Sequence, residues 1–358
     1  MERVEPTSVK IAIIGGGIGG FAAATALQHK GIQADVYEQT PALGEVGAGI
    51  IVHPPTQRLF KEWGVDKEFY SKAPLINTVQ LFTAQGEFVT NVTDNQLSSL
   101  KQDEEGMVPA SIRRTDLLNV VSGSVAPGRI HLDHKLASVV KTEEYVELTF
   151  ENGAVVRAEA VIAANGINSN IRKLFSDDEP LYSGLQSVRT ILDLETTKET
   201  AKEDATVMYN GDGVFLLLQP VAGGMHFDIG YPSEDPSWFT PVTKDELTAK
   251  MAGYDEKLVK LLDAIEYPIL ARALYHRRPI ERWSTKRITL LGDAAHSMLP
   301  TLGQGANTAI AGADAIARAL SECETVEEAL QQYEDERRPI TTAIQLESVR
   351  IDTALDVA

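Results

Sequence analysis

The feature that most constrains the fold is a glycine-rich turn near the start of the chain, at residues 15–20. The apolar run at residues 9–14 indicates a buried parallel strand, and the alanine-rich run at residues 18–30 indicates a helix. Residues 34–38 have the composition of a second short strand. A strand, a turn, a helix and a strand in this order predict a β-α-β unit that opens a parallel sheet.

The glycines of this turn have the spacing G-x-G-x-x-G at Gly15, Gly17 and Gly20. In a dinucleotide-binding turn, the first glycine allows the tight bend, the second lets a pyrophosphate approach the backbone, and the third lets the helix pack on the strand. The helix that Ile18 opens would direct free N–H groups at the phosphates. Glu38 ends the second strand, where a carboxylate can accept hydrogen bonds from a ribose. The turn by itself does not distinguish NAD from FAD.

Later parts of the chain predict a second, antiparallel sheet. Strand-like runs flank tight turns at residues 85–86 and 152–153, and residues 186–230 hold four more such runs. Residues 160–164 and 287–291 are further buried strands. The predicted fold class is therefore α/β, with a Rossmann-like parallel sheet, an inserted antiparallel-sheet substrate domain and C-terminal helices.

The parallel-strand patterns occur toward both ends of the chain, so the nucleotide-binding domain is expected to be discontinuous. From residue 305 onward the pattern is helical, with predicted breaks near Glu324 and at Pro339. The expected division is residues 1–75, 105–180 and 280–320 for nucleotide binding, 76–104 and 181–279 for substrate, and 321–358 for the C-terminal helices.

Charge and composition exclude several classes of function. The chain has 33 Lys and Arg against 51 Asp and Glu, a net charge of −18, which disfavours nucleic acid as a partner. Its one cysteine, Cys323, excludes an internal disulfide, and the seven histidines show no metal-ligand spacing, so no metal site is expected. No apolar run is long enough to span a membrane and no signal peptide is seen, so a cytoplasmic location is expected.

Two later motifs identify the kind of nucleotide. Residues 288–296 form a buried strand that ends in Gly-Asp, at Gly292 and Asp293. Pro300 and the run Gly-Gln-Gly-Ala-Asn at residues 303–307 then open a long helix. With these motifs in this order, the chain resembles the FAD-dependent aromatic monooxygenases of the para-hydroxybenzoate hydroxylase type. Within this type it is similar to salicylate hydroxylase and 6-hydroxynicotinate 3-monooxygenase, from about residue 10 to residue 338.

The resemblance implies which residues hold FAD. Glu38 matches an acidic residue on the adenosine ribose, Arg114 an arginine on the connecting chain, and Asp293 an aspartate that bonds ribityl or ribose hydroxyls. Without the resemblance, Asp293 would suit a helix N-cap equally well. The glycine-rich residues 47–50 match a stretch beside the flavin. The implied cofactor residues are Gly15, Gly17, Ile18, Gly20, Glu38, Gly49, Arg114, Asn165, Asp293, Pro300, Gly303, Gly305, Ala306 and Asn307.

One position departs from the family pattern. Relatives have Asp-Gly between the central strand and the next helix, whereas this chain has Asn165-Gly166. Asparagine keeps the size and hydrogen bonding of aspartate but loses its charge. Because the family aspartate is linked to both FAD and the reduced nicotinamide, the change bears on NAD(P)H use.

The substrate is expected to lie against the antiparallel sheet, on an apolar wall. Candidate catalytic residues are His53, which is alternatively a plain loop histidine, and Tyr209 and Pro300. Candidate substrate-binding residues are Phe215, Leu217, Gln219 and Arg189. Core packing explains most of them equally well, and Arg189 either binds a carboxylate or forms a structural ion pair.

The implied function is hydroxylation of an electron-rich aromatic or heteroaromatic ring. In the family, NADH or NADPH reduces FAD, and molecular oxygen forms a flavin C4a-hydroperoxide that transfers one oxygen atom. Two alternatives stay open: a halogenase-like or other flavin oxidoreductase, and an FAD-binding protein with weak catalysis. The three tryptophans match no halogenase signature. A small aromatic substrate is the expected partner, and the chain is expected to be a monomer or a homodimer.

Overall fold

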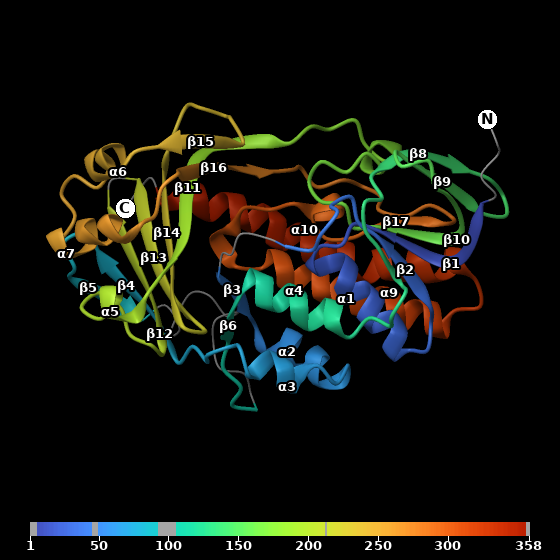
Figure 1. Cartoon of the computed structure of the whole chain (residues 1–358), viewed down its shortest axis with the longest axis horizontal. Helices are drawn as coiled ribbons and strands as arrows, with labels where there is room; N and C mark the ends of the chain where they lie inside the picture. Colours follow the sequence, from blue (N-terminus) through green and yellow to red (C-terminus); the bar gives the residue numbers. More distant parts are fainter. Residues whose placement is uncertain (1–5, 45–48, 92–104, 212, 356–358) are drawn as a thin grey trace.

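The computed structural model describes residues 6–44, 49–91, 105–211 and 213–355, with side chains described up to residue 350. Residues 47–48 of the flavin-adjacent stretch and residues 92–104 of the expected substrate domain lie outside the described residues. Figure 1 shows a sheet at each end of an elongated molecule, with helices between and beneath them. No helix in the described part of the chain is both long and apolar enough to cross a membrane.

The first sheet is the predicted nucleotide-binding sheet. Its central strands β1, β2 and β10 run parallel, and β10 also pairs with β17 in parallel. The four residues that end β1 are buried because helices cover the sheet. Residues 154–158 and 160–164, expected as two strands, belong to one strand, because β10 pairs with β1 along its whole length. The sheet consists of β7 (Ile130–His131), β2 (Ala34–Tyr37), β1 (Thr7–Ile14), β10 (Val155–Ala163), β9 (Val146–Phe150) and β8 (Leu136–Lys141), with β17 (Ile288–Leu290) beside β10.

The second sheet has eight strands and comes from the regions expected for the substrate domain. All its pairs are antiparallel except β12 with β4, which run parallel, as the long stretch of chain between them allows. In spatial order the strands are β15 (Phe239–Val242), β16 (Ile269–His276), β11 (Leu181–Leu192), β14 (Gly224–Pro232), β13 (Val214–Val221), β12 (Ala205–Gly211), β4 (Thr78–Thr83) and β5 (Phe88–Asn91). The division of the chain into domains stays a prediction.

The strand register gives this second sheet two distinct faces. Leu216, Leu218 and Phe227 point to the outer face, where they pack against short helices that cover this side of the sheet. The inner face carries the alternate residues, including Phe215 and Leu217. The outer-face helices are α5 (Leu194–Thr197), α6 (Lys244–Lys250), α7 (Glu256–Val259) and the 3-10 helix η4 (Lys260–Ala264).

A small two-stranded sheet joins the two halves. The strands β3 (Gly49–Val52) and β6 (Ala110–Arg113) pair antiparallel and pack against β13. At this junction the Gln219 amide donates a hydrogen bond to the Ser111 hydroxyl. The helices that follow these strands are α2 (Pro54–Glu62), α3 (Asp66–Tyr70) and α4 (Arg114–Gly123).

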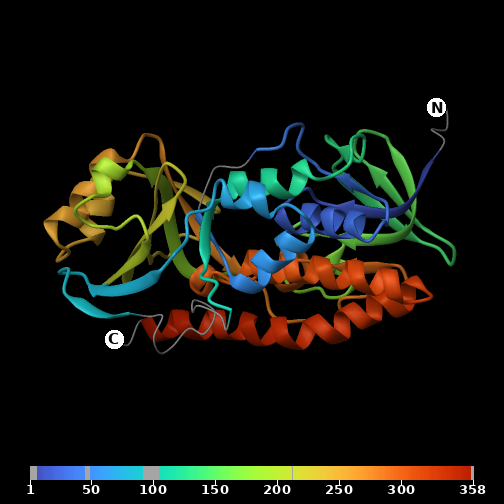
Figure 2. The same ribbon diagram turned by 90° about the horizontal axis from the view of Figure 1, so that it is seen from below.

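The C-terminal helices pack beneath the first sheet. The short elements α8 (Asp293–His296) and η5 (Pro300–Leu302) lead into α9 (Gly305–Glu322), which packs on α1 (Ile18–His29). The chain breaks at Cys323, as expected near Glu324, and α10 (Val326–Leu355) then runs along one side of the molecule (Figure 2).

The predicted helix break at Pro339 is wrong, because α10 continues through this residue. Proline removes one backbone hydrogen bond from a helix interior. Contacts on both sides of it hold α10 in place: Glu334 accepts hydrogen bonds from the backbone of Trp283 and Ser284, and the Gln345 amide donates to two backbone carbonyls.

Candidate active site

The glycine-rich turn has the geometry that a bound diphosphate requires. Gly15 has a φ of +108°, which favours glycine, and Gly17 is the N-cap of α1. No side chain caps α1, and its first turn holds no acidic residue. A Cβ added at Gly17 would meet no protein atom within 4 Å. The positive end of α1 is therefore open on the side where Gly17 and Ile18 lie.

Glu38 closes one side of this turn. Its carboxylate accepts hydrogen bonds from the backbone N–H of Gly16, at 2.5 Å, and of Thr40, at 2.9 Å. The side chain is half-buried at the end of β2, beside the turn, as the sequence predicts for a ribose-binding carboxylate.

The N-terminus of α9 is a second open helix end. Gly303 adopts a left-handed conformation with a φ of +61°, and α9 begins two residues later at Gly305. Neither a side-chain cap nor an acidic residue occupies the first turn, which contains Gly305 and Ala306. Pro300 begins η5 just before this turn and is exposed. Its side chain has no proton to transfer, and a catalytic role for Pro300 stays a prediction.

Asn307 has a different role from the one expected. Its amide oxygen accepts hydrogen bonds from the His53 backbone N–H and the Thr56 hydroxyl, and its amide nitrogen donates to the carbonyls of Ile51 and Gly303. Both amide donors and two oxygen lone pairs are thereby used within the protein. Asn307 therefore ties α9 to β3 and α2, and its side chain has no hydrogen-bonding capacity left for a flavin; its contact with FAD through the backbone of this open helix end stays a prediction.

His53 is the N-cap residue of α2 and lies beside Asn307, with only 3% of its surface exposed. Its backbone N–H is bound by Asn307 at 3.0 Å. Because the side chain is buried beside β3, its direct contact with a substrate stays a prediction.

Asp293 lies among arginines contributed by three different elements. Asp293 is an exposed residue, but desolvation by the protein around it raises the pKa of its carboxyl, against the lowering effects of Arg114 and Arg272. Burial lowers the pKa of the Arg114 guanidinium, and Asp293 opposes that shift. Arg189 lies near enough to repel both other arginines. The nucleotide-binding half and the inner face of the second sheet thus meet at this cluster.

Arg172 is a site residue that the sequence analysis missed. Its buried guanidinium donates to both oxygens of Asp178 and to the carbonyls of Ala294, Ala295 and Arg278. These five hydrogen bonds use every N–H of the group. Two of them hold α8 directly behind Asp293. Its position, seven residues after Asn165 and just beyond the motif that contains this residue, was the only available signal.

Asn165 lies at the end of β10, with its backbone packed against Gly15. Its amide nitrogen donates to Asn170, and its amide oxygen is buried without a partner among the described residues. A buried acceptor without a partner next to the glycine turn indicates that a ligand donor completes it.

The inner face of the second sheet carries an apolar wall beside a charged pair. The Phe215 ring lies directly over Gly230, and Leu217 is opposite Asp228 in the register. Next to them, Arg189 Nε lies 2.8 Å from an oxygen of Asp228, whose other oxygen accepts from Ser187. The structural ion pair left open for Arg189 is present, while its Nη2 is buried without a partner in the described structure.

Two candidate residues are not part of this apolar wall. The catalytic role of Tyr209 stays a prediction, and no contact in the structure supports it: Tyr209 points to the outer face, stacks on Phe82 and donates its hydroxyl proton to the Thr200 carbonyl. Gln219 lies on the inner face, but it is 2% exposed and bonded to Ser111 at the junction of the halves. Strand alternation separates Tyr209 from Phe215, because the two belong to opposite faces.

The profile of the FAD binding domain family matches residues 8–348. The chain belongs to this family. It is 30% identical to a 3-amino-4-hydroxybenzoate 2-monooxygenase of Streptomyces platensis, over 95% of this chain and 86% of that protein. It is 27% identical to the 6-hydroxynicotinate 3-monooxygenase of Bordetella bronchiseptica, over 94% and 89%. The fold matches Klebsiella pneumoniae HpxO complexed with FAD and uric acid, with a TM-score of 0.87, 24% identity and coverage of 97% and 89%.

These findings confirm the predicted fold class and family. This family member is an FAD-dependent monooxygenase, and FAD is its cofactor. Its own residues fit the cofactor, since the two open helix N-termini and the open side of Gly17 suit an anionic diphosphate, and the unpartnered oxygen of Asn165 suits a hydroxyl or N–H donor of the dinucleotide. No group of three potential metal ligands clusters within the described residues.

Two buried histidines make the fold of this flavoprotein sensitive to acid. Burial lowers the pKa of His226 to about 4 and that of His296 to about 3. In the unfolded chain both titrate near 6.5, so their contribution to stability is complete above that pH and is lost as the pH falls toward 4 and 3.

We expect each histidine to lower the free energy of unfolding by about 2 kcal/mol between pH 7 and pH 5. Urea titration at the two pH values measures the loss. His226→Gln should reduce it by about one half, and the exposed-site control His29→Gln should leave it unchanged. A loss that is the same in His226→Gln as in the wild type would contradict this origin.

Proposed function

We propose that this monooxygenase hydroxylates a phenolic or amino-substituted aromatic ring that also carries an anionic group, using NADH or NADPH and molecular oxygen. The observation that carries the proposal is the inner face of the second sheet, where the apolar Phe215 and Leu217 adjoin the Arg189–Asp228 pair. An aromatic ring suits the wall, and an anion suits the arginine.

The charges on this face favour an anion over a neutral ligand. Asp228 neutralises one charge of Arg189, but Arg272 lies on the same face of the neighbouring strand. Arg114 and Asp293 offset one another. Nη2 of Arg189 has no hydrogen-bond partner among the described residues, so it can donate a charge-assisted hydrogen bond to an anionic group of the substrate.

In this proposal the protein binds the cofactor, orients the substrate ring and shields both from water. Bound FAD supplies the activation of oxygen. The N-termini of α1 and α9 would hold the negatively charged parts of FAD, and Asp293, kept in position by Arg172, would accept hydrogen bonds from its hydroxyl groups. Phe215 and Leu217 hold the ring and exclude water, while Asp228 and Ser187 hold Arg189 toward the anionic group. Relatives named for hydroxybenzoates and hydroxynicotinate support this substrate class.

The proposal is tested by oxygen uptake and NAD(P)H oxidation with pairs of aromatic compounds, each a phenol with and without a carboxylate, followed by measurement of product mass. We expect a gain of one oxygen atom with the carboxylated member of a pair. Stimulation only by non-aromatic compounds, such as sugars or aliphatic acids, would refute the wall as a ring-binding surface.

Replacing Arg189 with methionine should raise the KM of a carboxylated substrate by about ten- to a hundredfold, because a charge-assisted hydrogen bond is lost. The KM of the uncarboxylated phenol should change by less than about threefold. Steady-state kinetics on both compounds separates the effects, with the exposed Arg157→Met as the control. An equal change in both KM values would show that Arg189 acts through stability alone.

Replacing Asn165 with aspartate should alter the rate of flavin reduction by NAD(P)H more than it alters FAD content. The aspartate restores a negative charge beside the glycine turn and removes the hydrogen bond donated to Asn170. Anaerobic stopped-flow absorbance measures the reduction rate, with the exposed neighbour Asn168→Asp as the control. Identical rates in wild type and variant would count against a role in nicotinamide handling.

Two expectations stay predictions: a cytoplasmic location, and a monomeric or homodimeric state. Cell fractionation tests the location, and light scattering on the purified protein tests the oligomeric state.

A further inference from the structure

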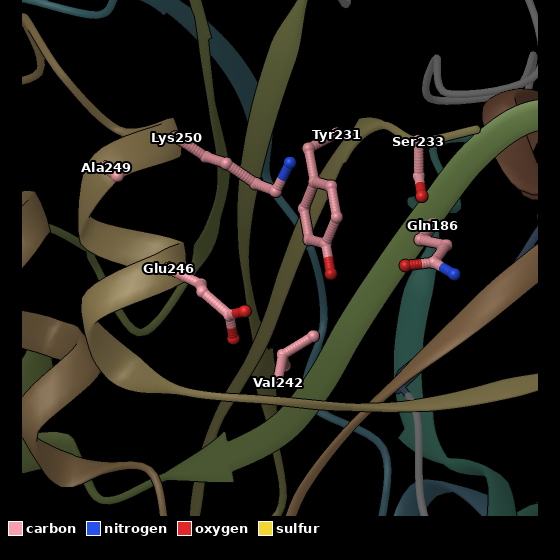
Figure 3. Close-up of a pocket in the computed structure, with 7 residues that line it drawn as sticks. All are labelled: Gln186, Tyr231, Ser233, Val242, Glu246, Ala249 and Lys250. Carbon is pink, nitrogen blue, oxygen red and sulfur yellow. The ribbon is translucent and has the colours of Figure 1, made fainter. Parts of the chain in front are cut away.

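A separate cavity lies on the outer face of the second sheet, under α6. Its volume is about 380 Å³. Gln186 and Tyr231 come from paired positions of β11 and β14, and Glu246 and Lys250 come from α6 (Figure 3). Arg189 and Asp228 lie on the opposite face of the same strands, so this cavity is distinct from the proposed active site.

The cavity has an unsatisfied hydroxyl at its floor. Tyr231 is 1% exposed, and its hydroxyl has no hydrogen-bond partner among the described residues. Figure 3 shows this hydroxyl directed into the space between the Glu246 carboxylate and the Gln186 side chain. Burial raises the pKa of Tyr231 to about 12, so the group is neutral and can both donate and accept. A buried hydroxyl without a hydrogen-bond partner lowers the stability of the folded protein, and a ligand that bonds to it would restore that stability.

The cavity also presents two opposite charges that do not pair with each other. Glu246 and Lys250 have the i,i+4 spacing at which helical ion pairs usually form. Glu246 instead accepts hydrogen bonds from Thr243, whose N–H lies 2.7 Å from the carboxylate. The Lys250 ammonium lies 4.4 Å from the centre of the Tyr231 ring. Only one oxygen of Glu246 is used by Thr243, so the other oxygen and the ammonium group both remain available to a ligand.

We propose that this cavity binds a small zwitterion with an ammonium group, a carboxylate and a short apolar chain, the chemistry of a free aliphatic amino acid. The ligand's ammonium group meets Glu246. Its carboxylate meets Lys250 and the Tyr231 hydroxyl. The hydrocarbon part packs on Val242 and Ala249, which line the same cavity. The proposal is independent of the substrate proposed above.

The test is titration calorimetry of the FAD-loaded protein with L-leucine as the probe. The compounds 4-methylpentanoate and 3-methylbutylamine have the same hydrocarbon chain, and each carries only one of the two charges. We expect leucine to bind saturably and each analogue to bind about tenfold more weakly or worse, because each loses a charge-assisted contact. Equal binding of the three compounds, or no saturable binding of leucine, overturns the proposal.

Variants locate the binding to this cavity. Tyr231→Phe removes only the hydroxyl, and Lys250→Met keeps most of the side-chain length; both should weaken leucine binding by about tenfold. Glu246→Gln should do the same, while glutamine preserves the capping box with Thr243. Lys257→Met, on exposed α7, is the matched control and should bind as the wild type does. Thermal unfolding checks that each variant is folded, and unchanged leucine affinity in folded Tyr231→Phe and Lys250→Met refutes the site.

Discussion

Replacing Gly20 with alanine should abolish FAD binding and destabilise the protein by about 3 kcal/mol or more. A Cβ at this position would overlap the carbonyl oxygen of Gly15, which is backbone and cannot move aside. The overlap would force α1 away from the turn, so the helix end would no longer face the phosphates. Flavin absorbance of the purified variant and urea unfolding of its apo form measure the two effects.

Two other glycines provide matched comparisons. Gly123→Ala meets no atom within 4 Å at the end of α4 and should change the stability by less than about 1 kcal/mol. Gly17→Ala also meets no protein atom, so it should fold normally and yet bind FAD more weakly, since its methyl group would occupy the ligand side of the turn. Normal FAD content in Gly20→Ala would contradict the packing argument, and normal affinity in Gly17→Ala would contradict the position of the diphosphate.

Replacing Arg172 with methionine should lower the free energy of unfolding by about 3–5 kcal/mol. The variant leaves three backbone carbonyls without a donor and removes one of the two arginines that pair with Asp178. Since two of those carbonyls belong to α8, FAD affinity should also fall as Asp293 loses its support.

Urea unfolding of the apo form and fluorescence titration with FAD measure the two consequences. The control is Arg157→Met, whose exposed ion pair with Glu147 should contribute less than about 1 kcal/mol. A loss in Arg172→Met that is no larger than in Arg157→Met would show that the buried hydrogen bonds do not hold α8.

Local rules made the nucleotide-binding half predictable from the sequence. The glycine spacing fixes which residues can bend the chain at Gly15, and the helix that follows must present its N-terminus there. The same holds at Gly303 and α9. Strand alternation also showed that Phe215 and Leu217 share one face, because side-chain direction in a strand depends only on residue parity.

The alternation of side chains along a strand does not reveal which face of the sheet lies toward the cofactor. It also does not reveal which distant residue forms hydrogen bonds with a given side chain. Tyr209 lies on the outer face, in the cluster that packs with α6 and α7, and the sequence does not reveal on which face those helices pack. The side-chain amide of Asn307 forms three of its hydrogen bonds with β3 and the start of α2, more than 250 residues away along the chain. The pairing of Arg189 with Asp228 arises from the register of β11 with β14.

The motifs at residues 15–20, 288–296 and 300–307 carry the resemblance that predicts the family and its FAD cofactor, because residue types at short, fixed spacings can be recognised without a structure. Contacts between distant segments required the folded chain: Arg172 supports α8, Arg114 and Arg272 act on Asp293, and Tyr231 lines the cavity under α6. Hydrogen bonds, burial and charge act between atoms that are close in space, and the packing of the two sheets sets those distances.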